Sequence, residues 1–329
     1  MRPVLFTTFA LALLLPLASG AQGFGSVGGT EPFTLSVDPQ YPAPFSQATL
    51  GVQSSSLDLT NAIMTVTVAG KELYRGTVQP TKLTLGKAGS ITKVTVAVVI
   101  NGATNSQTIS IQPQDVSLIA EPISSAPPLY AGKPLVPLEG STRIVAVANV
   151  RNANNSAIDP ATLSYAWTVD DTKIANSSGI GKSAVLVASP IQYRARTVSV
   201  AITSQDGTLV GGDSLSLSPQ DPSVRIYEND PLLGIRFDRA LMNTFSIGST
   251  ESTLYAAPFS LPTGNGTPFL QWFVNGSAAQ TGTSITLRPS GSGEGSASLS
   301  LTASSGSQTT SASLSLIFGA KPGSNFFGL

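Results

Sequence analysis

The sequence contains no cysteine and no histidine, and only 11% of its 329 residues are charged. The absence of cysteine excludes disulfides, thiol nucleophiles and thiolate metal ligands. The absence of histidine removes the commonest general base and zinc ligand. A serine nucleophile needs an activating base, so the many serines and threonines do not indicate a hydrolase. We predict a protein that is not an enzyme and uses no cofactor or metal, with a hydrolase as a distant alternative.

Charge of either sign is scarce, and the 18 Lys and Arg residues balance the 18 Asp and Glu residues. Proteins that bind nucleic acid neutralise phosphates with clustered basic residues, and anionic membranes attract polybasic segments. The sequence has neither feature. It therefore excludes nucleic acid as a partner and leaves membrane contact only through an uncleaved signal segment.

What the sequence does have is short apolar runs that alternate with serine and threonine, punctuated by 31 glycines and 23 prolines. The segment 94–100 carries Val or Ile at every second position, as a half-buried strand does. Asn101-Gly102 follows, which is the strongest short-range signal for a β-hairpin. These patterns predict an all-β protein.

One strand pattern recurs along the chain. It reads Tyr165-Ala166-Trp167 in one copy and Leu270-Gln271-Trp272 in another, and a fainter copy has Val66 in place of the tryptophan. The three positions are about 100 residues apart, the length of a small β-sandwich. We predict three sandwiches in tandem with Trp167, Trp272, Val66 and Tyr165 in their cores. The alternative for the two tryptophans is stacking on sugar rings.

The first 21 residues resemble a secretory signal. Arg2 gives the positive start, Val4–Leu17 is almost entirely apolar, and Ser19-Gly20-Ala21 offers small residues for cleavage. The apolar run is shorter than the roughly 20 residues that span a bilayer. We predict an extracytoplasmic protein that is secreted, periplasmic or on the cell surface, exported through a Sec-type signal peptide.

Pro-Gln-Asp occurs at 113–115 and again at 219–221, and these repeats mark the joints between domains. The predicted organisation is a signal peptide (1–21), a flexible leader (22–31), three sandwiches (32–113, 114–220 and 221–318) and a C-terminal tail (319–329).

Both later repeats carry an extra stretch after their first strand, and the first repeat does not. The stretches begin Pro128-Leu129-Tyr130 and Pro231-Leu232-Leu233. We expect each to form a hairpin along the sandwich edge that packs on the neighbouring domain. Apolar residues outside the strands gather in these inserts and in the tail, so the candidate interaction residues are Tyr130, Leu232, Leu233, Phe326 and Phe327.

Four aspartates, Asp170, Asp171, Asp206 and Asp213, could meet at one end of a domain and bind calcium, which prefers several oxygen ligands. Their spacing matches no dedicated calcium loop. We interpret them instead as solvated turn residues.

Tyr165-Ala166-Trp167, followed later by Asp206-Gly207, resembles bacterial immunoglobulin-like and PKD-type sandwich domains; Trp272 and Asn275-Gly276 repeat the likeness. Val169-Asp170-Asp171 departs from the Trp-x-Phe-Gly-Asp pattern of PKD domains. The resemblance implies an extracytoplasmic module that acts as a structural spacer or in protein interaction or adhesion, with another envelope protein as partner. The alternative is a carbohydrate-binding accessory module, with Tyr193, Tyr227 and Tyr255 as the sugar-facing candidates.

Overall fold

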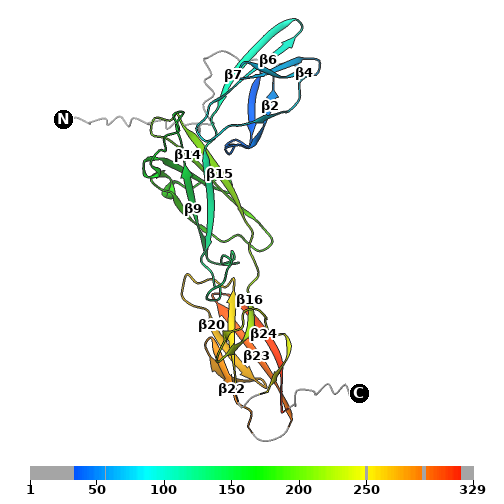
Figure 1. The fold of residues 1–329 in the computed structure, drawn as a ribbon, viewed down its shortest axis with the longest axis vertical. Coiled ribbons are helices and arrows are strands. Elements are labelled where there is room, and N and C mark those ends of the chain that lie inside the picture. Colours follow the sequence, from blue (N-terminus) through cyan, green and yellow to red (C-terminus); the bar gives the residue numbers. More distant parts are fainter. Residues whose placement is uncertain (1–32, 56, 249–250, 291–293, 320–329) are drawn as a thin grey trace, which may run out of the picture. The chain divides into compact units, whose positions relative to one another are not determined.

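The computed structural model describes residues 33–55, 57–248, 251–290 and 294–319. These residues form strands β1 to β24 and two single-turn 3₁₀ helices, η1 and η2 (Figure 1). No helix in the described ranges is long and apolar enough to cross a membrane. The predicted signal peptide, leader and most of the tail lie outside the described residues.

The strands assemble into three pairs of sheets. The first pair consists of β1-β2-β5 and β4-β3-β6-β7. Its strands are β1 (Thr34–Asp38), β2 (Gln47–Gln53), β3 (Ile63–Val68), β4 (Lys71–Thr77), β5 (Thr81–Thr84), β6 (Thr92–Ile100) and β7 (Ala103–Ile111). Asn101 and Gly102 join β6 to β7 with φ values of 48° and 81°, the left-handed conformation that a tight hairpin turn requires.

The second pair consists of β13-β9-β8 and β11-β10-β14-β15, with β12 also pairing with β10. Its elements are β8 (Asp115–Pro122), β9 (Ser141–Asn149), η1 (Pro160–Thr162), β10 (Ser164–Val169), β11 (Thr172–Lys173), η2 (Ala175–Ser177), β12 (Gly179–Ile180), β13 (Ala184–Ala188), β14 (Arg196–Thr203) and β15 (Val210–Leu217). β8, β9 and β13 share one sheet, and β10, β14 and β15 share the other. This division of strands between two sheets is that of an immunoglobulin-like sandwich.

The third pair consists of β17-β16-β19-β22 and β18-β24-β23-β20-β21. Its strands are β16 (Ser223–Asp230), β17 (Gly234–Ile235), β18 (Asn243–Ile247), β19 (Ser252–Phe259), β20 (Phe269–Val274), β21 (Ser277–Thr281), β22 (Ser284–Leu287), β23 (Gly295–Ser305) and β24 (Gln308–Phe318). β18 pairs in parallel with β24 and covers the edge of the final strand.

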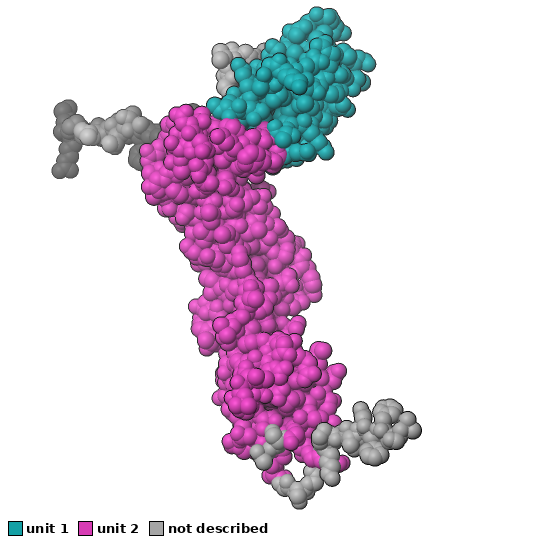
Figure 2. Space-filling model, viewed as in Figure 1, with its two compact units in different colours: residues 1–40, 47–84, 91–111 teal, residues 41–46, 85–90, 112–329 magenta. Residues whose placement is uncertain are grey.

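Separate apolar cores lie between the paired sheets of the second and third sandwiches. Alternating residues of both sheets supply them, as the period-two pattern predicts. The predicted all-β tandem array of immunoglobulin-like sandwiches is therefore confirmed. The chain divides into two compact units (Figure 2). Unit 1 contains the strands of the first sandwich. Unit 2 contains the second and third sandwiches together with segments 41–46 and 85–90.

Candidate functional site

Both tryptophans lie inside the cores and are wholly inaccessible to solvent. The indole Nε1–H of Trp167 donates to the carbonyl of Lys182 at 2.9 Å, and that of Trp272 donates to the carbonyl of Gly282 at 2.9 Å. Each ring is thus packed between two sheets with its polar atom paired. Neither ring is available to stack on a sugar.

The other two predicted core residues are buried as well. Val66 on β3 is fully buried in the first sandwich, and Tyr165 lies beside Trp167 in the core of the second. The Tyr165 hydroxyl donates to the carbonyl of Pro160 at 3.1 Å. Burial, and secondarily the charge of Asp159, raises the pKa of Tyr165 above its usual value.

Three of the four aspartates considered for calcium accept hydrogen bonds at separate places in the second sandwich. Asp170 accepts from the backbone N–H of Thr197 and pairs with Arg196 at 2.9 Å. Asp206 accepts from Ser204 and Thr208 within its own turn, and these bonds lower its pKa.

Asp213 accepts from the N–H of Leu118 at 2.8 Å, which ties β15 to β8. Asp171 is exposed in a turn at φ 62°. Within the described ranges, no group of three or more acidic side chains is placed to hold a metal ion.

The three tyrosines considered for sugar binding are not brought together. Tyr227 and Tyr255 face each other across β16 and β19, and the ring of Phe237 covers both edge-on, with centroid distances of 5.2 and 6.0 Å. Burial raises the pKa of Tyr255. Tyr193 is 91% exposed but stands in a loop of the second sandwich. No aromatic platform of three rings is formed by these residues.

The segment between β8 and the insert of the second sandwich, together with the insert itself, forms a junction with the third sandwich. Directly after β8, the N–H of Ser125 donates to Leu261 O at 2.7 Å, and the N–H of Ser260 donates to Ser125 O at 3.1 Å. The side chain of Ser125 accepts from the N–H of Leu261, and Thr263 N–H donates to Ile123 O. These bonds extend a short antiparallel ladder from one sandwich to the next.

Side chains of the same insert strengthen the junction. Tyr130 is 43% exposed, and its ring meets Phe259 of the third sandwich edge-on at 5.6 Å. The carboxylate of Glu139 accepts from the N–H and the hydroxyl of Ser307, and these bonds lower the pKa of Glu139. The predicted packing of this insert on the next domain is observed. The expected hairpin is not, because no strand forms between Pro122 and Ser141.

The insert of the third sandwich does form a hairpin, in which β17 pairs with the end of β16. The carboxylate of Asp230 accepts from the N–H groups of Leu232 and Leu233 at 2.8 and 2.9 Å, and these bonds lower its pKa. Leu232 and Leu233 are 93% and 70% exposed at the tip of this turn. The two leucines are therefore held outward by an ordered turn.

The candidate interaction residues separate into two places. Tyr130 belongs to the junction inside unit 2, whereas Leu232 and Leu233 stand at a turn of the third sandwich. Phe326 and Phe327 lie outside the described residues. The sequence gives no indication of Ser125, Glu139 and Ser307, because polar residues in loops and turns carry no periodic signal.

No protein-family model matches the sequence, and no curated protein matches it. Among solved structures, the chain is similar to the central fibronectin-III array of RIM-binding protein, with 10% identity, 88% of this chain and 96% of that chain covered, and a TM-score of 0.31. It is also similar to three N-terminal domains of the highly immunogenic outer capsid protein (Hoc) of bacteriophage RB49, with 11% identity, 88% and 99% coverage and a TM-score of 0.24. The fibronectin(III)-like modules of Clostridium thermocellum CbhA match at 12% identity, 60% and 95% coverage and a TM-score of 0.23. TM-scores this low carry no argument about function, and the fold rests on the strand order above.

Proposed function

We propose that the chain is a non-catalytic exported spacer of a bacterial envelope that holds a protein-binding surface away from its point of attachment. The observation that carries the proposal is the junction between the second and third sandwiches. A spacer transmits position only where its domains cannot swivel freely, and domains joined by a bare linker move relative to one another by default.

The junction opposes such movement with directional contacts. Backbone bonds from Ile123 and Ser125 reach Ser260, Leu261 and Thr263. Hydrogen bonds between backbone groups are short and directional, so they constrain the angle between the two sandwiches as well as the distance. The ring contact between Tyr130 and Phe259 and the hydrogen bonds between Glu139 and Ser307 hold the two sandwiches together at two further places.

The surface that such a spacer would present is the turn that carries Leu232 and Leu233. Asp230 orders that turn through two backbone bonds, so little conformational entropy is lost when the leucines are covered. Export and an envelope partner are part of this proposal and rest on the signal-like N-terminus. The carbohydrate-binding alternative gains no support from Tyr227 and Tyr255, whose rings Phe237 covers.

The experiment that tests the spacer role measures whether the second and third sandwiches hold a fixed separation. Because the chain has no cysteine, Lys173→Cys and Ala279→Cys place one nitroxide label on each, at exposed positions. We expect a narrow distance distribution by pulsed electron spin resonance. Ser125→Pro, which removes the Ser125 donor and its hydroxyl, should broaden the distribution.

The matched control is Pro128→Ala, an exposed change in the same insert that removes no junction hydrogen bond. It should leave the distribution narrow. A broad distribution in the labelled protein before any junction change would contradict the spacer role.

A further inference from the structure

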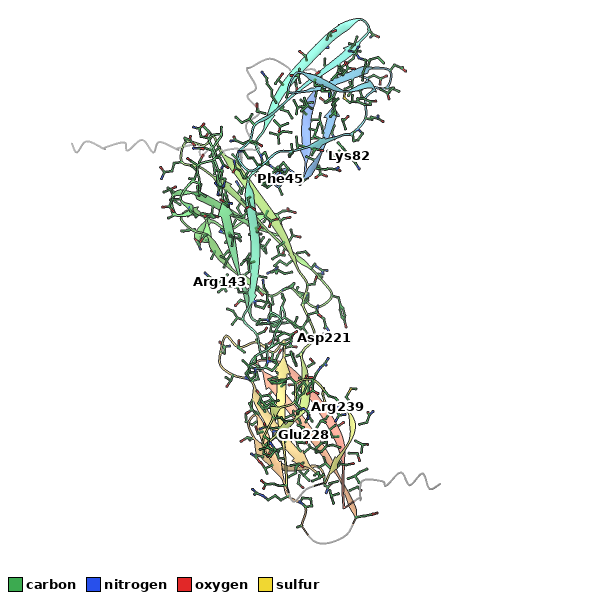
Figure 3. All side chains as sticks on the ribbon, in the orientation of Figure 1. Phe45, Lys82, Arg143, Asp221, Glu228 and Arg239 are labelled. Atoms are coloured by element: carbon green, nitrogen blue, oxygen red, sulfur yellow. The ribbon has the colours of Figure 1, made fainter. Side chains whose placement is uncertain are left out.

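The second sandwich ends one of its sheets in an edge strand with an unusual composition. β13 reads Ala184-Val185-Leu186-Val187-Ala188 and is the outermost strand of the order β13-β9-β8. Sheet edges are normally protected by charges or prolines, since an open edge pairs readily with another chain. The equivalent edge strand of the first sandwich carries Lys82 (Figure 3). β13 has neither a charge nor a proline.

The register of β13 shows which backbone groups face outward. Ala146 N–H donates to Ser183 O at 2.8 Å, and Ser189 N–H donates to Gly140 O at 3.0 Å. Bonded residues alternate along an antiparallel ladder, so Val185 and Val187 bond to β9. The N–H and C=O groups of Ala184, Leu186 and Ala188 therefore point away from the sheet.

Within the described residues, few of these outward backbone groups have a hydrogen-bond partner. The side chain of Arg196 donates to Ala188 O at 3.0 Å. The single-turn helix η2 lies beside β13, but among the described residues no backbone hydrogen bond joins it to the strand. Leu186 is 61% exposed, while Val185 and Val187 are buried in the core. Apart from Ala188 O, which Arg196 would have to release on pairing, the strand thus offers unpaired backbone groups and the exposed side chain of Leu186.

The sequence of β13 is also palindromic. Alanine, valine, leucine, valine and alanine read the same in both directions. In an antiparallel pair of two β13 strands centred on Leu186, leucine faces leucine, valine faces valine and alanine faces alanine. Because Leu186 directs its backbone groups outward, the central Leu186–Leu186 pair is a hydrogen-bonded pair. Each Ala184 then faces an Ala188 of the other strand, and these two pairs are hydrogen-bonded pairs as well.

We propose that a second copy of this chain pairs its β13 antiparallel with the first, around a two-fold axis at Leu186. The pairing joins two three-stranded sheets into one continuous sheet, and a two-fold contact closes without leading to filaments. The zero net charge of the chain removes long-range repulsion between the copies. This inference goes beyond the proposed spacer role and does not depend on it.

The contact is small, because it consists of one short strand and its outward leucine. Interfaces below about 1,200 Å² are typical of weak association. We therefore expect a dimer that forms at micromolar concentration and exchanges rapidly, not an obligate one.

Cysteine cross-linking tests the register directly, because the natural chain contains no cysteine. Bonded residues of an antiparallel pair have Cα atoms about 5.5 Å apart, within the range that a disulfide spans. The full chain with Leu186→Cys should form a disulfide-linked dimer at least about tenfold faster than the full chain with Leu232→Cys, whose leucine is even more exposed. Equal rates for the two variants would overturn the proposed register.

Sedimentation velocity of the unlabelled chain provides the second arm. The sedimentation coefficient should rise with concentration over about 1–200 µM, the range for a weak contact. Leu186→Lys should abolish the rise, while Leu232→Lys should not, and tryptophan emission should report that both variants are folded. A natural chain that stays monomeric over this range, or a Leu186→Lys variant that still dimerises, rules the pairing out.

Discussion

A tryptophan that fills the space between two sheets must also find an acceptor for its indole nitrogen there. Trp167 and Trp272 solve this in the same way, by donating to the carbonyls of Lys182 and Gly282. Burying such a ring stabilises a domain by at most about 4–6 kcal/mol, at about 25 cal/mol per Å² of apolar surface. For a sandwich without disulfides this is a large part of the total stability.

Replacing either tryptophan with phenylalanine should therefore destabilise its own sandwich. Trp272→Phe leaves the carbonyl of Gly282 without its donor and opens a small cavity, so we expect a loss of about 1–3 kcal/mol in the third sandwich. Calorimetric unfolding of the variant measures this loss, while the emission of the remaining Trp167 during denaturant unfolding shows that the second sandwich is unchanged; Trp167→Phe gives the reciprocal experiment. Phe269→Ala, at a residue that is 59% exposed, is the control and should cost under about 0.5 kcal/mol.

At the residue scale, the sequence predicts apolar positions better than polar ones. Trp167, Trp272 and Val66 follow from a period of two and a repeat of about 100 residues. The hydrogen bonds of Asp213 and Glu139 do not follow from any pattern, because each side chain accepts from a residue that is far away in the chain. No local pattern specifies such a partner.

At the scale of single elements, the tight turns depend on residues that tolerate left-handed backbone. Asn275 and Gly276 connect β20 to β21 with φ values of 49° and 77°. An added Cβ at Gly276 would meet nothing within 4 Å. The cost of substituting this glycine is thus a cost of backbone conformation alone.

Gly276→Ala should destabilise the third sandwich by about 1–2 kcal/mol, the penalty for a left-handed L-residue. Gly264→Ala is the matched control in the same sandwich, since its surroundings are equally open and its φ is not in the left-handed region. It should be neutral or stabilise by about 0.4–1 kcal/mol. Denaturant unfolding followed through Trp272 measures both, and equal effects would show that the turn conformation is not what matters.

The two inserts show where prediction from sequence fails at this scale. Their shared Pro-Leu start predicts a common hairpin, yet only the third sandwich forms one. There Asp230 closes the turn, and Phe237 packs on Tyr227 and Tyr255. The second insert begins with Pro128 directly after Pro127, and proline cannot donate to a ladder. Its chain therefore leaves the sheet and reaches the neighbouring sandwich.

For the whole molecule, the absence of histidine and cysteine sets the response to pH. No side chain with an ordinary pKa near neutrality is present. Asp206 and Asp230 have lowered pKa values in the fold because they accept hydrogen bonds from nearby side chains and backbone N–H groups. Their contribution is complete above the unfolded value near 4 and is lost as pH falls through the lower folded value.

The buried tyrosines set the alkaline limit. Burial raises the folded pKa of Tyr165 and Tyr255, so their contribution is complete below about 10 and is lost as pH rises through the higher folded value. We expect a thermal midpoint that is constant between about pH 5.5 and 9 and falls on both sides. A step near pH 6.5, measured by calorimetry, would contradict this account.

The tandem arrangement itself could be predicted, since it follows from the spacing of one strand pattern and from hairpin signals such as Asn101-Gly102. The packing of the second insert on the third sandwich could also be predicted, but the backbone hydrogen bonds between Ser125 and Leu261 could not, because nothing in the local sequence connects these two residues. Where most hydrogen bonds of a contact join backbone atoms, few side chains are specific to it, so the local sequence gives little sign of the contact.

The same pair of residues has a consequence for synthesis. Ser125 and Leu261 are 136 positions apart, and ribosomes add about 5–20 residues per second, so roughly 7–27 s separate their translation. Domains generally fold in order from the N-terminus, so a second sandwich that folds before the third leaves the backbone N–H and C=O of Ser125 without their partners until the third sandwich has formed. The hydrogen bonds between these two sandwiches are therefore expected to be among the last contacts that form.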